Sequence, residues 1–331
     1  MLKVLLVVAL VAAGCLIAGA IYEKIAEARF ARRYPPPGRL VDVGGRRMHL
    51  LCKGAAPGPT VVIEQGAASP AVVWEPIQDR LAASARVCLY DRAGYQWSDP
   101  APAGRSLTDR ADDLHRLLKA AGVLGPYVLV AHSYGGAISR VFAHRYPADV
   151  VGMVLVDTPE EAVVFRSSFT AYRRQFLRMV AVGKAAARVG LIRLVMGALS
   201  RPEGGMTPEM NDEMVGFISD PHFGAPLADE LRSLEQGRED LAPVGHPGAL
   251  GDLPLTVITH EKPFPGFAAL LEPGWQDGQR RLAALSSRGH LVVAHRSTHM
   301  IQVEEPDLVI DAVRRVLGEA SVPAERARAT A

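Results

Sequence analysis

From Gly38 onward, short runs of aliphatic and β-branched residues alternate with segments of helical length. This alternation limits the fold because strands separated by helices pair in parallel, with each helix crossing back over the sheet. Gly44-Gly45 lies between the first two runs and is a hairpin signal, so the sheet is expected to begin with antiparallel strands. The sequence therefore predicts a mostly parallel α/β sheet of eight strands. The predicted strands are residues 40–43, 48–52, 60–63, 87–90, 127–131, 151–156, 255–259 and 291–294.

The N-terminus contains 19 consecutive uncharged residues, 4–22. At about 1.5 Å per helical residue this run is about 28 Å long, close to the ~30 Å hydrocarbon thickness of a bilayer. We interpret residues 1–22 as an uncleaved transmembrane helix that makes this a membrane protein. The alternative is a signal peptide cleaved after Ala18-Gly19-Ala20, which makes the protein secreted or periplasmic. The orientation stays open: the basic residues that follow the run favour a cytoplasmic domain, whereas export is the common fate of such anchors.

The charge balance and cysteine content exclude several classes of function. The chain has 37 Lys and Arg against 35 Asp and Glu, a net charge of +2, so it has no overall field for a polyanion and nucleic acid is not an expected partner. Its 3 cysteines are too few for a disulfide scaffold, and no metal site or cofactor is expected. The oligomeric state is left open.

The chemistry concentrates around Ser133. It lies between a predicted strand, residues 127–131, and a helix-compatible segment, residues 137–146. A serine at such a corner is held in a tight backbone conformation with its hydroxyl exposed, and it needs small residues two positions before and after it. Ala131 and Gly135 meet that need. The pattern predicts a serine nucleophile, and the alternative is a serine that only caps the helix.

Two further segments follow predicted strands: residues 64–67, Glu-Gln-Gly-Ala, and residues 91–98, Asp-Arg-Ala-Gly-Tyr-Gln-Trp-Ser. With the serine corner, they make residues 38–317 similar to the α/β-hydrolase superfamily, although Gln65 replaces the His of the family's His-Gly loop. The resemblance implies that the backbone amides of Ala67 and Tyr134 form an oxyanion hole. The 91–98 segment is similar to the family's Asp-x-Arg-Gly-x-Gly-x-Ser turn and is expected to be structural.

The family places its catalytic base in the loop after the last strand, where this chain has His299. An imidazole accepts the hydroxyl proton during attack and returns it to the leaving group. His295 lies four residues earlier without the Glu of a zinc helix motif, so metal binding is not expected. His132, beside the serine, is expected to point away from it.

The acid of the triad has two candidates. The usual family position, after the next-to-last strand, holds Pro263, which leaves Glu261 out of register. Some members place the acid after the strand that follows the nucleophile helix, where this chain has Asp157. We prefer Asp157, because a side chain at the carboxyl end of a strand next to the nucleophile strand reaches the imidazole. Glu261 remains the alternative acid.

Between Asp157 and Leu255 lie 97 residues, far more than a loop needs, which predicts a helical cap. Residues 162–199 are basic and amphipathic. One interpretation is that this part rests on anionic lipid and admits an apolar acyl substrate. The other is that its apolar face packs on the sheet while its arginines pair with the acidic residues 203–241.

Domain boundaries follow from these patterns. The expected divisions are an anchor at 1–22, a linker at 23–38, a hydrolase core at 39–157 and 251–318, a cap at 158–250 and a disordered tail at 319–331. Within the linker, the charged residues 23–34 are expected to be helical and Pro35-Pro36-Pro37-Gly38 to be an extended breaker. The resembled topology makes the strands that carry Cys52 and Cys88 neighbours, and both a disulfide and free thiols remain open.

Together these features predict a membrane-anchored serine hydrolase that cleaves a carboxylic ester or related acyl bond, with a small and apolar substrate and no cofactor. Its catalytic residues are Ser133, His299 and Asp157. The alternatives are an acyltransferase with the same acyl-enzyme, or a ligand-binding protein on this fold without catalysis.

Overall fold

The computed structural model describes residues 1–202 and 206–321, and its centre is the predicted mostly parallel sheet of eight strands. The order across the sheet is β1-β2-β4-β3-β5-β6-β7-β8; β2 is antiparallel to both of its neighbours and all other pairs are parallel. The fold class expected from the alternation of strands and helices is confirmed. The strands are β1 (Arg39–Asp42), β2 (Arg47–Lys53), β3 (Thr60–Glu64), β4 (Val87–Tyr90), β5 (Tyr127–His132), β6 (Val150–Val156), β7 (Leu255–His260) and β8 (Gly289–Ala294).

Helices cover both faces of this sheet. Successive side chains of a strand point to opposite faces, and the central strands β3, β5 and β7 are buried at every position, so their apolar residues supply two cores. On β3, Val62 belongs to one core and Val61 and Ile63 to the other. The first core packs under α3 (Leu107–Ala120), α4 (Tyr134–Arg145) and α11 (Trp275–Ala283). The second core packs under η1 (Ala71–Trp74), α2 (Glu75–Ala82) and α13 (Pro306–Ser321).

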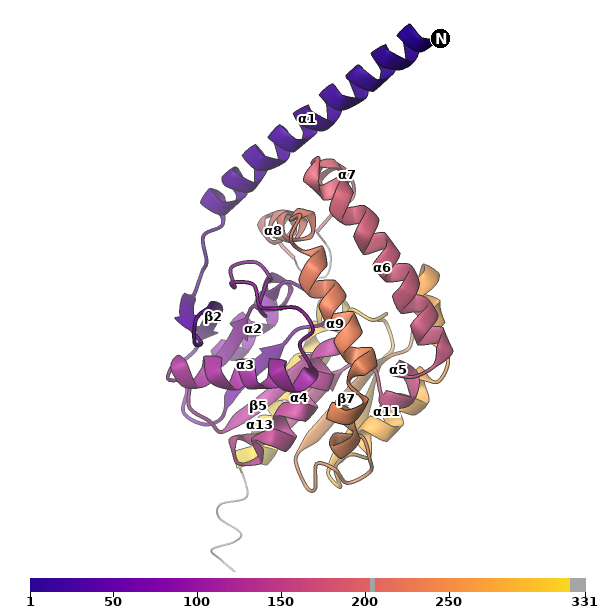
Figure 1. Ribbon diagram of the computed structural model, residues 1–331. Coiled ribbons are helices and arrows are strands. Elements are labelled where there is room, and N and C mark those ends of the chain that lie inside the picture. The colour runs from indigo at the N-terminus through magenta and orange to yellow at the C-terminus, as the bar shows by residue number, and fades with distance from the viewer. Residues whose placement is uncertain (203–205, 322–331) are drawn as a thin grey trace, which may run out of the picture.

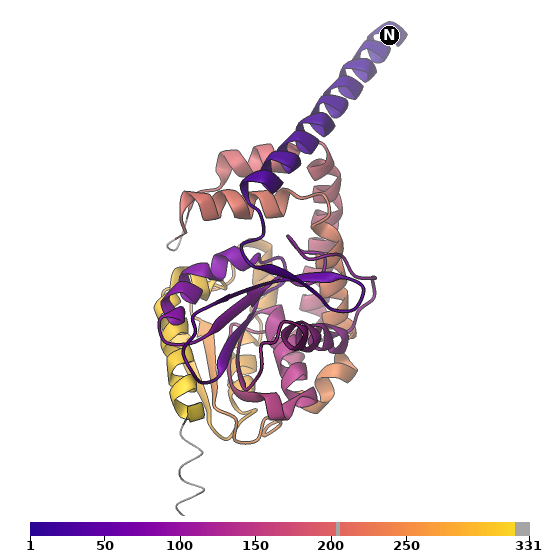
Figure 2. The ribbon, with the colours of Figure 1, turned by 90° about the vertical axis from the view of Figure 1, so that its left-hand side faces the viewer.

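The cap is the chain between β6 and β7. Figures 1 and 2 show its long helices stacked above one end of the sheet. This is the carboxyl end of the parallel strands, because Glu230 of the cap contacts Arg92, which follows β4. The cap helices are α5 (Glu161–Val164), α6 (Ser167–Arg188), α7 (Leu191–Leu199), α8 (Pro208–Ser219), α9 (Gly224–Gln236) and α10 (Arg238–Leu241). The remaining short helices are η2 (Pro147–Asp149), η3 (Ala242–Val244), η4 (Gly266–Leu271) and α12 (Ile301–Glu304).

The N-terminal segment is one helix, α1 (Leu2–Arg33), which extends away from the body of the molecule (Figure 1). It is the single helix of the described residues whose length and composition would let it cross a membrane. The residues expected to link anchor and core continue this helix as far as Arg33. They do so because the cap supports them: Glu23 is 1% exposed and pairs with Arg193 of α7, and Phe30 packs on Gly216 of α8.

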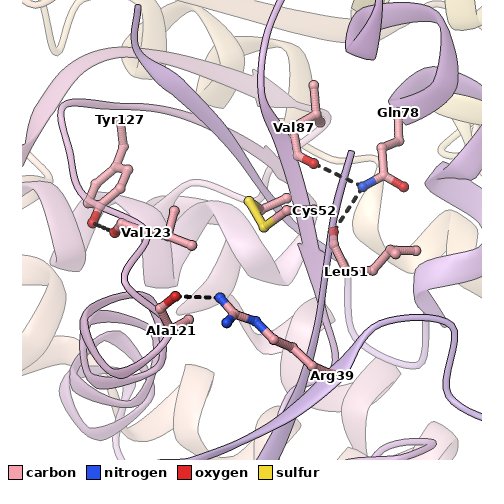
Figure 3. The surroundings of a disulfide bond; sticks show 9 residues. Arg39, Leu51, Cys52, Gln78, Val87, Ala121, Val123 and Tyr127 are labelled. Carbon is pink, nitrogen blue, oxygen red and sulfur yellow. Dashed lines mark hydrogen bonds between the residues drawn. A yellow bond between two sulfur atoms is a disulfide. The ribbon is translucent and has the colours of Figure 1, made fainter. Parts of the chain in front are cut away.

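Cys52 and Cys88 form a disulfide between β2 and β4, where they lie directly opposite in the antiparallel register. Figure 3 shows the bond beside Gln78 of α2, whose amide donates to the carbonyls of Leu51 and Val87 and so ties the same two strands together.

At the C-terminus, α13 continues to Ser321, so residues 319–321 of the expected tail are helical. The rest of that tail, 322–331, lies outside the described residues.

Candidate active site

Ser133 sits in a strained corner between β5 and α4. Its φ is +50° and its ψ −123°, a conformation that a residue with a Cβ rarely adopts. A backbone hydrogen bond stabilises this conformation: the Ser133 amide donates to the Val156 carbonyl at 3.0 Å. A Cβ on Gly135 would lie 2.5 Å from the Glu64 carbonyl oxygen, so the glycine lets α4 begin directly against the end of β3. Ser133 keeps partial solvent exposure at this corner.

The structure brings Ser133, His299 and Asp157 into one hydrogen-bonded row. His299 Nε2 lies 3.0 Å from Ser133 Oγ, and His299 Nδ1 lies 2.6 Å from Asp157 Oδ2. The three residues come from three different connections: the β5–α4 corner, the end of β6, and the loop between β8 and α12. Asp157 also has a positive φ, +47°, so the acid and the serine are both presented by strained turns after neighbouring strands.

Asp157 is fully buried and receives hydrogen bonds on both carboxylate oxygens. Besides His299, the donors are His260 Nδ1 at 2.7 Å, Trp275 Nε1 at 2.9 Å and the His260 backbone amide at 3.2 Å. Burial raises the pKa of Asp157, but the hydrogen bonds from His260 and His299 outweigh it and bring the pKa below its ordinary value. The carboxylate is therefore ionised and held in one orientation.

His260 and Trp275 are site residues that the sequence reasoning missed. The position of His260 follows from the strand order. Because β7 pairs with β6, His260 at the end of β7 lies beside Asp157, which follows β6. Burial lowers the pKa of His260, whereas its hydrogen bond to the Asp157 carboxylate raises it. The second effect prevails, with help from the charge of Asp157, so the pKa of His260 lies above its ordinary value.

Glu261, the alternative acid, lies outside this row. Its carboxylate contacts His295 Nδ1 at 2.9 Å on the exposed surface. The reason is that successive side chains along a strand point to opposite sides. His260 at the end of β7 points to Asp157, so Glu261 points away from it.

His132 does not point away from the site as expected. It donates from Nε2 to the His299 backbone carbonyl at 3.0 Å, and the two rings lie 4.6 Å apart. Burial, and then the neighbouring His299, lowers the pKa of His132 to about 3. His132 is therefore neutral and supports the loop that carries His299.

The loop after β3 lies against the serine corner. A Cβ on Gly66 would lie 3.2 Å from Ser133 Cβ, which places the Gly66–Ala67 peptide beside Ser133. Gln65, which stands where the family has His, donates its amide to the Tyr90 carbonyl at 2.6 Å and so fixes the start of this loop to β4. Tyr134 is the first residue of α4, so its amide is one of the unpaired donors at a helix N-terminus.

Arg92 fixes the direction of the Gly66–Ala67 peptide. Its guanidinium donates to the Gly66 carbonyl at 2.7 Å and to the Gln65 carbonyl at 2.6 Å. In a planar trans peptide the carbonyl of residue 66 and the N–H of residue 67 point in opposite directions, so a donor on the one sets the aim of the other. Arg92 belongs to the 91–98 segment, which was expected to be structural. This segment therefore contacts the loop that carries Ala67.

Two carboxylates hold Arg92 in place. Glu64 at the end of β3 accepts a hydrogen bond at 2.6 Å, and Glu230 of cap helix α9 accepts another at 2.6 Å. Tyr95 donates to Glu230 at 2.9 Å. Arg92 and both carboxylates are at most 5% exposed, so this network is a buried ion-pair cluster that joins the core to the cap.

A cavity of about 310 Å³ lies within the cap and reaches Ala68, the residue after Ala67. Its lining is mostly apolar and comes from α6, the start of α7, and the α8–α9 region. The aromatic stripe of α6 is divided: Phe169 belongs to the first core, whereas Tyr172 and Phe176 stack with Phe267 of η4. Of the basic residues of α6, Arg173 pairs with Glu235 at 2.6 Å, while Arg174, Arg178 and Arg188 are exposed.

The described residues contain no group of three or more His, Cys, Asp or Glu side chains that could hold a metal ion.

Comparisons with known proteins agree on the fold. The sequence profile of the alpha/beta hydrolase fold family matches residues 59–191. An uncharacterised Bacillus subtilis protein, YqjL, is 26% identical over 267 residues, which cover 81% of this chain and 87% of that protein. A probable transporter of Hormonema carpetanum is 36% identical over 129 residues, which are 37% of this chain and only 18% of that protein. The structure of a thermophilic esterase from Thermogutta terrifontis superposes with a TM-score of 0.62 at 19% identity and covers 85% of this chain and 97% of its own.

Proposed function

Because this chain belongs to the α/β-hydrolase superfamily, we propose that it is a serine hydrolase that cleaves a carboxylic ester or a related acyl bond. The observation that supports this proposal is the hydrogen-bonded row of Ser133, His299 and Asp157, with distances of 3.0 and 2.6 Å. A serine at the corner, in place of an aspartate, favours acyl transfer over epoxide opening or dehalogenation through an ester intermediate.

In the proposed reaction, Ser133 Oγ attacks the carbonyl carbon of the substrate while its proton passes to His299 Nε2. Asp157 stabilises the imidazolium and holds its Nδ1–H, which leaves Nε2 facing the serine. When the tetrahedral intermediate collapses, His299 gives its proton to the leaving alcohol and an acyl-enzyme remains. Water, activated by the same imidazole, then attacks the acyl-enzyme and releases the carboxylic acid.

The negative oxygen of the tetrahedral intermediate needs hydrogen-bond donors that are already in place. Its stabilisation by such donors is usually a large part of the rate enhancement. The backbone amides of Ala67 and Tyr134 are the proposed donors. Arg92 supports the first of them, because it holds the Gly66 carbonyl of the same peptide unit at 2.7 Å.

The substrate is proposed to be apolar and the enzyme to be anchored in a membrane by α1. The apolar cavity that reaches Ala68 supports the first part, since an acyl chain bound there starts next to the proposed oxyanion hole. The uncharged run of α1, residues 4–22, has no buried residue and supports the second part.

A fluorophosphonate probe tests the proposal, because it reacts covalently with activated serines. The wild type is expected to be labelled on Ser133, and Ser133→Ala to show no labelling above background. No labelling of a correctly folded wild type, or equal labelling of the variant, rejects the serine-hydrolase assignment. In an ester assay, release of the free acid identifies a hydrolase, whereas transfer to an added alcohol identifies an acyltransferase.

A further inference from the structure

Helix α7 is apolar except for Arg193 and yet has no buried residue. Leu191, Leu194, Val195 and Leu199 expose between 43% and 72% of their surface. Its one charged residue, Arg193, is turned away from solvent and pairs with Glu23 of α1 at 2.5 Å. A helix of this composition is ordinarily covered by protein or lipid, because exposing several large aliphatic side chains to water is unfavourable.

The contacts between α1 and the cap fix the depth of α7 relative to the anchor. A Cβ on Gly19 would lie 2.5 Å from the Val189 carbonyl oxygen, and a Cβ on Gly190 would lie 2.5 Å from the Tyr22 ring. Gly19 and Tyr22 lie in the last turn of the uncharged run 4–22. The corner between α6 and α7 is therefore at the level where the apolar part of α1 ends, which for a spanning helix is the membrane interface.

The direction of α7 fits that interface. Figure 2 shows α7 and α8 lying crosswise at the base of α1, between the body and the apolar end of that helix. A helix that lies across the anchor at this level runs parallel to the membrane plane. Exposed basic residues flank α7 on both sides, Arg188 before it and Arg201 after it, as is usual for helices that bind anionic lipid headgroups.

We propose that α7 is an interfacial helix, embedded in the surface of the bilayer that holds α1, and that it opens the cap cavity to lipid. Ile192 of α7 and Ala68 beside the proposed oxyanion hole line the same cavity. An acyl chain in this cavity therefore runs from the bilayer to Ala68, beside the proposed oxyanion hole. This inference rests on the proposed function and narrows its substrate class to esters whose acyl chain resides in the membrane.

A bilayer explains the exposed face better than a second copy of the chain does. A nine-residue helix is about 13 Å long and offers far less than the ~800 Å² per partner of a standard protein interface. With α1 in the bilayer as proposed, the bilayer surface also reaches α7, because α1 and α7 contact each other through Glu23 and Arg193.

Quenching by brominated lipid tests the contact directly, without any use of activity. The full chain with Leu194→Trp is reconstituted in phosphatidylcholine and phosphatidylglycerol vesicles, with and without bromine near the middle of the acyl chains. The matched control is Leu124→Trp, since Leu124 is 75% exposed on the connection between α3 and β5, at the opposite end of the parallel strands from the cap. The emission of the wild type, with its 3 tryptophans, is subtracted.

The proposal predicts that brominated lipid quenches the tryptophan introduced at position 194 by about half, and leaves the one at position 124 unquenched. Equal quenching at the two positions overturns it. So does an unquenched, blue-shifted emission at position 194 in a chain that runs as a dimer, because a second copy then covers α7.

A second arm separates this inference from the proposed function. Leu194→Glu with Leu199→Glu is expected to lower the rate on a long-chain ester held in vesicles by about tenfold, and to leave the rate on a water-soluble acetyl ester unchanged. Equal rates of variant and wild type on both esters overturn the lipid route. Quenching of Leu194→Trp as expected, together with a wild type that cleaves neither ester, contradicts the proposed function and leaves the membrane contact intact.

Discussion

Asp157 is buried, yet its charge is stabilised from several directions. If it is the acid of the triad, Asp157→Asn removes the negative charge that stabilises the imidazolium of His299 and favours the wrong tautomer. The acylation rate is then expected to fall by about 10³- to 10⁴-fold, measured as burst kinetics with a nitrophenyl ester. Glu261→Gln is the control, because the Glu261 carboxylate pairs with the exposed His295 outside the row, and its rate is expected to stay within about twofold of the wild type. If Glu261→Gln loses the activity and Asp157→Asn keeps it, the acid of the triad is Glu261.

The local sequence identifies the residues of this row one by one but not their surroundings. Ser133 follows from its strand-to-helix corner, and His299 and Asp157 follow from their places after strands. The contribution of His260 and Trp275 depends on which strands are neighbours and which way each side chain points. Those facts are set by the pairing of β6 with β7, which no local pattern contains.

Arg92 is a positioning residue that acts on the proposed oxyanion donor through a backbone peptide. Arg92→Lys keeps a positive charge for Glu64 and Glu230, but an ammonium group lacks the planar fork that reaches both carbonyls and both carboxylates. The expected result is a fall in kcat of about tenfold or more with KM within about twofold, because the donor matters most in the transition state.

Arg110→Lys is the matched control for this experiment. Arg110 is 9% exposed and pairs with Asp229 of α9 at 2.8 Å, so it also joins core and cap, but the structure gives it no contact with the 65–67 loop. It is expected to lose stability without a comparable loss of kcat. Equal kcat values for the two lysine variants would show that Arg92 acts only on cap docking.

At the scale of elements, α8 meets the loop after β4 through a carboxyl with an unusual pKa. Burial raises the pKa of Glu213 to about 7, although Gln96 donates to it at 2.8 Å. A carboxyl whose pKa is raised by folding stabilises the fold fully below its ordinary pKa of about 4.3, and that contribution is lost as the pH rises through 7.

Glu213→Gln is therefore expected to gain thermal stability relative to the wild type as the pH rises from about 5 to 8. The measurement is the difference in Tm between variant and wild type at each pH. Glu209→Gln, in the exposed first turn of the same helix, is the control and should show a constant difference. A constant difference for both variants contradicts the assignment of the titration to Glu213.

The eight strands follow from the sequence because central parallel strands are continuous apolar runs that helices rarely imitate at that length. The place of the second half of α1 does not. A charged helix over residues 23–34 is expected from the sequence and is observed as far as Arg33, but the structure packs it on the cap, above all through the buried pair of Glu23 and Arg193. Only the tertiary arrangement brings those two residues, 170 positions apart, together.

At the scale of the whole molecule, two features disagree on which side of the membrane the body lies if α1 spans a bilayer as proposed. The basic residues after the anchor, Lys24, Arg29, Arg32 and Arg33, outnumber Lys3 before it and favour the cytoplasm. The disulfide between Cys52 and Cys88 favours an oxidising compartment, since cytosolic thiols are kept reduced. We give the disulfide more weight, because the two sulfurs lie in paired strands and meet without any rearrangement of the backbone.

Thiol labelling tests whether the disulfide forms in the native protein. A maleimide polymer, added to membranes under denaturing conditions without reductant, is expected to label one of the 3 cysteines. The labelled one is Cys15 of α1, the free cysteine of the described residues. After reduction, all three should be labelled. Labelling of three thiols before reduction would place the body on the reducing side of the membrane.

The buried cluster around Arg92 also limits how this protein can be engineered. Glu230 belongs to the cap, so replacing the cap with one from a relative removes a partner of Arg92 and leaves its charge undercompensated in the core. A chimaera that transplants specificity must therefore bring a carboxylate to the place of Glu230, or lose catalysis even where the new pocket fits its ligand. In such hybrids, the choice of substrate and the ability to react are inherited together.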